Sequence, residues 1–173
     1  GWKKACKANI GLAKGLNIID GQIVYEPIAN AFNLPHHTLE NILATNYYTL
    51  NHINPSIYEK AHHTSARYPR EQSEFEATEL TPHYEQDFAA PYVQESILKI
   101  GLKLEEHTTL AINDTVLVIG SIQQVILENE LVLQEDGFLD LELAQTVTSS
   151  GLDSYHTTQK LGRLAYAKPK SSA

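Results

Sequence analysis

Cysteine is almost absent from this chain, and methionine is absent altogether. The single cysteine, Cys6, excludes an internal disulfide within the 173 residues, so we expect a reducing, cytoplasmic compartment. No run of eighteen or more apolar residues occurs, and we therefore expect no membrane span. The basic start at residues 2–4 leads into no long apolar stretch, so we expect no signal peptide either.

Positive charge is scarce as well. Thirteen Lys and Arg stand against 21 Asp and Glu, which gives a formal net charge of −8. A nucleic-acid binder needs a basic face, so we expect no nucleic-acid partner. Apolar residues make up 42% of the chain and charged residues 20%, which is typical of a globular protein. We expect a single domain spanning residues 1–173, large enough to bury a core without metals or disulfides.

The common signatures of metal and nucleophile sites are missing too. The sequence has no His-x-x-x-His and no Cys-x-x-Cys, and two adjacent histidines on a helix do not face one site. It also has no Gly-x-Ser-x-Gly, no Walker-type phosphate loop and no Gly-x-Gly-x-x-Gly. We therefore expect no metal site, and no catalytic side chain is assigned from the sequence.

Short apolar segments separated by turns favour a mainly β barrel with short α-helical insertions over a Rossmann fold. Residues 115–127 are apolar on both faces, which predicts a central strand, with Gly120 at a close backbone approach. Asp20-Gly21 predicts a turn, and residues 65–95 predict an excursion with short helical turns. Further strands are predicted at 23–25, 47–53 and 98–104, and helices at 38–44, 54–64 and 139–144.

A first candidate anion site is the start of the helix predicted at 38–44, just after His36 and His37. Thr38 is a good N-cap, and the first N–H groups of a helix have no partner within it. Together with the positive end of the helix dipole, these groups could hold a phosphate. The alternative interpretation is an ordinary helix cap.

A second candidate anion site lies in residues 61–70, where two hydroxyls precede two guanidinium groups. Arg67 could bind a phosphate through two parallel hydrogen bonds, with the Ser65 hydroxyl adding a third. The alternative interpretation is solvated charge at the end of a helix, where cations are stabilised by the dipole.

Seven short stretches occur in an ordered combination that is more specific than any one of them. They are PHHTLENI (35–42), YYTLNH (47–52), AHHTSARYP (61–69), SEFE (73–76), AAPYV (89–93), LVIGSI (117–122) and GLDSYH (151–156). In this combination, from about residue 35 to the C-terminus, the chain resembles the flavin reductase-like family of FMN-binding split barrels.

This resemblance implies a six-stranded, Greek-key-type split barrel, a homodimer, and FMN bound at the boundary between the subunits. Thr38 and Asn41 would lie near the FMN phosphate, and Ser65 and Arg67 would complete that phosphate site. The strand that ends at Asn51 and His52 would lead towards the flavin. The FMN-binding residues implied by the resemblance are Thr38, Asn41, Asn51, His52, Ser65 and Arg67.

The function implied is reduction of flavin by NADH or NADPH, with reduced flavin passed to a downstream acceptor. Direct hydride transfer requires no side-chain acid or base, in keeping with the absence of a catalytic triad. One alternative is an FMN-binding electron-transfer module without a nicotinamide site, and another is a small-molecule barrel without flavin.

The chain departs from the family pattern in residues 20–35. Relatives carry Asn-Leu-Ala or Asn-Val-Ala after the Asp-Gly turn, followed by a long run that includes Asn-Pro-Pro and passes along the isoalloxazine ring. Here the corresponding stretch is shorter. Residues omitted from the printed sequence would explain both this gap and the absence of methionine.

Overall fold

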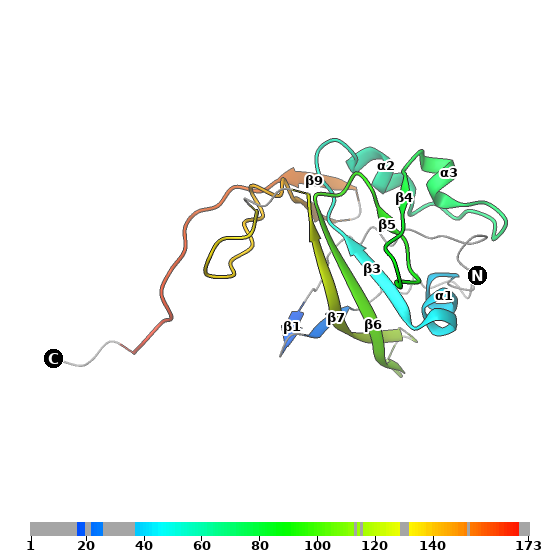
Figure 1. Ribbon diagram of the computed structural model, residues 1–173, viewed down its shortest axis with the longest axis horizontal. Coiled ribbons are helices and arrows are strands. Elements are labelled where there is room, and N and C mark those ends of the chain that lie inside the picture. The colour runs from blue at the N-terminus through cyan, green and yellow to red at the C-terminus, as the bar shows by residue number, and fades with distance from the viewer. Residues whose placement is uncertain are drawn as a thin grey trace.

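The main feature of the fold is an antiparallel sheet of five strands in the order β1-β2-β7-β6-β3 (Figure 1). These are β1 (Asn17–Ile19), β2 (Gln22–Tyr25), β3 (Tyr47–Asn51), β6 (Leu98–Thr109) and β7 (Val116–Leu127). The computed structural model describes residues 17–19, 22–25, 37–112, 114, 116–128, 132–151 and 153–169.

Short helices and two ribbons surround this sheet. The helices are α1 (His37–Thr45), α2 (Tyr58–His63) and α3 (Glu74–Thr78). One ribbon pairs β4 (Pro82–His83) with β5 (Tyr92–Val93), and the other pairs β8 (Val147–Ser150) with β9 (Ser154–Thr157). Figure 1 shows the helices on one side of the molecule and the C-terminal segment running away on the other. Within the described part of the chain, none of the helices is long and apolar enough to cross a membrane.

The strongest sequence pattern is confirmed by the sheet. Strand β7 lies in the middle of the five strands and pairs with β6 on one side and β2 on the other. Strands β2 and β3 also fall where the sequence predicts them, and β6 continues five residues past the predicted end. The predicted turn Asp20-Gly21 lies outside the described residues, but Ile19 and Gln22 on either side are paired.

Two of the predicted helices are corrected by the structure. The helix predicted from residue 54 begins at Tyr58, because the Asn54 Oδ1 accepts hydrogen bonds from the Ser56 N–H (2.9 Å) and hydroxyl (2.6 Å) and holds a separate turn. The helix predicted at 139–144 is a series of turns. There Asp140 caps two N–H groups, and Gln145 adopts a left-handed φ of 51° that prevents propagation of a helix.

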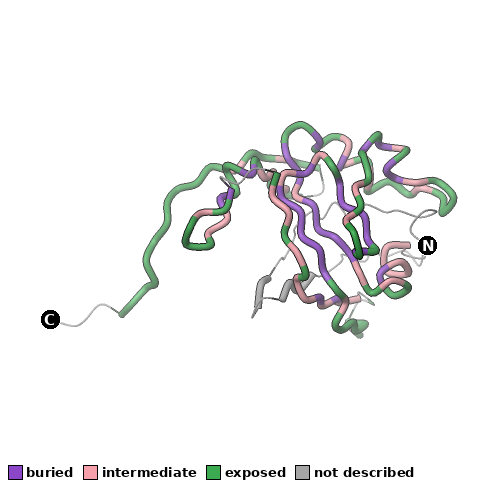
Figure 2. The backbone as a smooth tube through the Cα atoms, in the orientation of Figure 1, coloured by how far each residue is buried: buried purple, intermediate pink, exposed green. Residues whose placement is uncertain are grey.

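Core side chains cover both faces of β3 and of the first half of β6, whose buried residues Figure 2 shows. On one face Tyr48 and Leu50 pack with their strand partners Leu102 and Ile100 in the larger core cluster. On the other face lie Phe88, Ala90 and Tyr92 from the segment that leads into β5.

A glycine permits the close approach on each face. A Cβ at Gly101 would lie 2.0 Å from the Tyr92 hydroxyl oxygen, and a Cβ at Gly120 would lie 2.3 Å from that of Tyr48. The predicted close approach at Gly120 is therefore confirmed. The Tyr48 hydroxyl is buried without a hydrogen-bond partner, and burial raises its pKa.

We predict that Gly120→Ala lowers the free energy of unfolding by about 1–3 kcal/mol, because the added methyl also meets the Lys103 carbonyl at 2.9 Å. Tyr48→Phe alone should be neutral or stabilising, since it removes an unpartnered buried hydroxyl. Adding Gly120→Ala to Tyr48→Phe should cost less stability than adding it to the wild type, as measured by urea unfolding. Equal losses with and without the tyrosine hydroxyl would contradict this contact.

Candidate functional site

The first predicted anion cluster lies in the first turn of α1. The helix begins at His37, so Thr38 lies one residue inside it and not at the cap. Thr38 and Asn41 are both half-buried, one turn apart on this nine-residue helix. The backbone N–H groups of this first turn have no partners within the helix, and the helix dipole places partial positive charge there. The arrangement therefore retains the features that favour an anion.

The second predicted cluster follows α2 in a series of tight turns. The Ser65 hydroxyl and N–H both donate to the His62 carbonyl, at 2.7 and 3.1 Å, which closes the end of the helix. Arg67 comes two residues later with an exposed side chain. The Ser65 hydroxyl must therefore rotate away from His62 before it can donate to a ligand, whereas Arg67 brings a positive charge at the surface.

An ion pair brings these two segments together. Arg70, at the end of the second cluster, pairs its guanidinium with the carboxylate of Glu40 in the first turn of α1. This guanidinium holds the pKa of the Glu40 carboxyl below its usual value. Because the pair is exposed, it adds little to stability. The pair matters for geometry, because it links two residues 30 positions apart in sequence. The segment that carries Thr38 therefore adjoins the segment that carries Arg67.

Asn51 has a structural role that the sequence did not indicate. Its side chain is 1% exposed, and its Oδ1 accepts a hydrogen bond from the Val93 N–H of β5 at 3.0 Å. Its amide donates to the Thr49 hydroxyl (3.0 Å), which donates in turn to the Pro91 carbonyl (2.7 Å). These bonds attach β5 to the sheet through side chains, and they engage the Oδ1 and one amide N–H of Asn51 within the fold.

His52 is held in place as a neutral imidazole. The backbone N–H of His52 donates to the Leu98 carbonyl, and its backbone carbonyl accepts from the Ser96 hydroxyl. The ring Nδ1 lies 3.0 Å from the Thr146 hydroxyl. Burial lowers the pKa of the ring to about 4, so His52 carries no charge at neutral pH. Its position relative to a flavin stays a prediction.

Tyr155 is the residue near the site whose role sequence reasoning missed. Its hydroxyl lies 2.9 Å from the Nδ1 of His62, and its ring contacts the rings of Tyr58 and His62. The β8–β9 hairpin therefore supports the end of α2 that positions Ser65. The motif at 151–156 was the available signal, but no local pattern showed that it would reach a helix 93 residues earlier.

A pocket of about 140 Å³ lies apart from the two anion clusters. None of the six predicted FMN-binding residues lines it, although Thr146, the partner of His52, does. Among the described residues, no three His, Cys, Asp or Glu side chains group as metal ligands. The pocket is lined by Pro55, Glu142, Gln145, Thr146, Thr157 and Thr158.

A comparison with known families identifies the family of this chain. Residues 25–142, more than half of the chain, match the family described as the flavin reductase like domain. The chain is a member of the flavin reductase-like family. The sequence resemblance is thereby confirmed, and the match includes α1, α2 and all strands from β3 to β7.

Solved structures show the same fold. One is a candidate flavin reductase with a split barrel domain from Shewanella frigidimarina NCIMB 400, 53% identical, with a TM-score of 0.75. The alignment covers 84% of this chain and 70% of that chain. The flavoredoxin of Desulfovibrio vulgaris (Miyazaki F) is 21% identical with a TM-score of 0.68, covers 86% and 76% respectively, and shows the fold alone. The expected mainly β, split-barrel class with short helices is confirmed.

A curated relative extends the comparison to another bacterium. A protein of Aquifex aeolicus (strain VF5) without an assigned function is 27% identical over 131 residues, which is 76% of this chain. The chain spans 60% of the length of that relative.

We predict that acid destabilises this flavin reductase-like protein partly through His52. Its pKa is about 4 in the fold and about 6.5 in an unfolded chain, so the unfolded state binds the proton first as the pH falls. Between about pH 6.5 and 4, the wild type should lose up to about 3 kcal/mol more stability than His52→Gln. Urea unfolding at pH 7 and 4.5 measures this difference, and parallel losses would show that burial does not hold His52 neutral.

Proposed function

We propose that this flavin reductase-like protein binds FMN and reduces it with NADH or NADPH. The observation that supports it is the Arg70–Glu40 ion pair, which holds the segment carrying Ser65 and Arg67 against the first turn of α1. One phosphate monoester would then meet a helix N-terminus and a guanidinium together. In a chain of net charge −8, such a local concentration of anion-binding groups favours an anionic ligand at this place.

The residues present fit the phosphate end of FMN. A phosphate dianion is stabilised by the free N–H groups of α1, by the Thr38 hydroxyl and by Arg67. Asn41, one turn after Thr38, supplies a polar side chain beside it, and Ser65 joins after its hydroxyl rotates. When bound, the flavin supplies the hydride-accepting chemistry.

The side chains on the flavin side act by positioning. Asn51 fixes β5 against β3, so we propose that it shapes the site without donating to the ligand. His52 presents an uncharged ring whose Nδ1 is engaged by Thr146. No acid or base is required for the hydride step, and we assign no catalytic residue.

We also propose a homodimer in the cytoplasm. Strand β7 is apolar on both faces, yet only Val118 and Gly120 along it are buried, and Val125 is 44% exposed. A partner subunit would cover this surface. The single cysteine of the sequence supports a reducing compartment.

The absorbance spectrum of the purified protein, followed by anaerobic addition of NADH or NADPH, tests the proposed activity. We expect flavin bands that bleach when either nicotinamide is added. Flavin bands that persist with both nicotinamides would instead indicate an electron-transfer module. Absence of flavin bands and of FMN uptake would contradict flavin binding altogether.

We predict that Arg67→Ala weakens FMN binding about 10- to 100-fold, and that Arg67→Lys weakens it less, because an ammonium replaces only part of a guanidinium contact. Riboflavin, which lacks the phosphate, should bind both variants as it binds the wild type. Lys60→Ala removes a cation of the preceding helix that is paired with Glu79, and serves as the control. A similar loss for riboflavin and FMN would exclude Arg67 as a phosphate ligand.

A further inference from the structure

Exposed large apolar side chains are concentrated at the C-terminal end of the described chain. Of eleven such residues, six lie between residues 133 and 166. Three are on the final extended segment, residues 159–169, which we call the arm: Leu161, Leu164 and Tyr166 are 101%, 98% and 91% exposed. Figure 2 shows the arm exposed along its length as it leaves the body. Apolar side chains gathered on one exposed segment indicate a surface that a partner covers.

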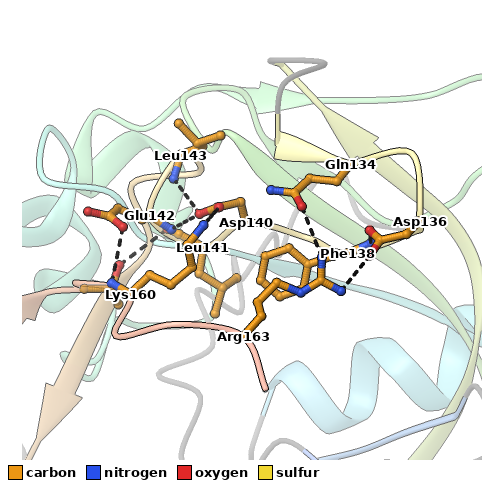
Figure 3. A network of polar contacts seen from close by, with 10 residues as sticks. Gln134, Asp136, Phe138, Asp140, Leu141, Glu142, Leu143, Lys160 and Arg163 are labelled. Atoms are coloured by element: carbon orange, nitrogen blue, oxygen red, sulfur yellow. Dashed lines mark hydrogen bonds and ion pairs between the residues drawn. The ribbon is translucent and has the colours of Figure 1, made fainter. Parts of the chain in front are cut away.

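The start of the arm is fixed by specific contacts. Arg163 pairs with Asp136 at 2.7 Å, donates to the Gln134 side-chain oxygen at 3.2 Å, and stacks on the Phe138 ring at 4.2 Å (Figure 3). Lys160 forms an ion pair with the buried carboxylate of Asp140. All four partners lie in residues 132–145, which we call the arm root. The arm therefore leaves the body in a defined direction.

The arm root is itself apolar on its outer side. Leu133, Leu141 and Leu143 are each between 43% and 48% exposed. The arm and its root together thus present two apolar elements, one extended and one folded, on the same end of the molecule. Neither element covers the other within one copy of the chain.

The charges at the start of the arm are neutralised within the chain, so apolar side chains are what the arm offers to a partner. The arm carries three cations, Lys160, Arg163 and Lys168, and no acidic residue, whereas the whole chain has a net charge of −8. The two cations at its start already pair with carboxylates of the arm root. What remains for a partner is apolar surface, and a second copy of this chain offers the same exposed leucines.

We propose that the arm is a clasp that packs Leu161, Leu164 and Tyr166 onto the arm root of a second copy of this chain. This rests on the homodimer proposed above and names the segment that holds it together. A two-fold axis makes the exchange reciprocal, so that each arm covers the leucines of the other root. Nine extended residues from 161 to 169 reach roughly 30 Å, enough to cross an interface of ordinary size.

The test compares three forms of the full chain by sedimentation velocity over a range of concentrations. The arm variant Leu161→Ser/Leu164→Ser/Tyr166→Ser removes the apolar contacts, and the control Gln159→Ser/Lys168→Ser changes two exposed polar positions of the same arm. We expect the dimer dissociation constant to rise at least 100-fold in the arm variant and less than about 3-fold in the control. The FMN affinity of the wild type, measured in parallel, reports separately on the proposed function.

Elastase cleavage after Ala165 and Ala167, which lie beyond the contacts of Arg163, provides the second measurement. In the wild type, cleavage should slow as rising concentration drives dimerisation, and the arm variant should be cut rapidly throughout. A dimer of unchanged affinity in the arm variant would overturn the clasp while leaving the homodimer intact. A wild type that is monomeric at all concentrations would overturn the clasp as well. Protection that does not depend on concentration would also overturn it, because the arm would then fold back on its own chain.

Discussion

Two glycines on neighbouring strands allow both faces of the sheet to be covered by aromatic rings. Tyr48 lies over Gly120 on one face, and Tyr92 and Phe88 lie over Gly101 on the other. Any larger residue would separate the layers, because the nearest atoms would be closer than 3 Å to its Cβ. The position of β5, and of the loops and helices that continue from it, depends on this close packing.

The segments that form the candidate site lie outside this packed sheet. Asn51 and Thr49 attach β5 to β3 by buried side-chain bonds. Tyr155 supports the end of α2, and the Arg70–Glu40 pair joins the following loop to α1. The candidate anion-binding groups thus come from two segments that are positioned by contacts between residues far apart in sequence.

Sequence patterns predicted those strands and close contacts that depend on the local composition of the chain. The two-faced apolar run of β7 and its glycine were recognisable because burial on both sides leaves a distinct composition. The helix predicted at 139–144 was wrong because the Asp140 carboxylate competes for the backbone N–H groups, which hydrophobic spacing does not reveal. The bond from Asn51 to Val93 could not be predicted, since the two residues lie 42 positions apart in sequence. The sequence indicated the two candidate anion clusters one by one, and it gave no sign of the Arg70–Glu40 pair that connects their segments.

The central claim is that these clusters form one binding site for the phosphate of FMN, and the pH dependence of the ³¹P resonance of bound FMN tests it most directly. The dianion of a phosphate monoester in water takes up a proton near pH 6. Held by Arg67 and the start of α1, it should remain a dianion, and its resonance should not move between about pH 7.5 and 5.5. A bound phosphate that titrates near pH 6, as free FMN does, would contradict the account.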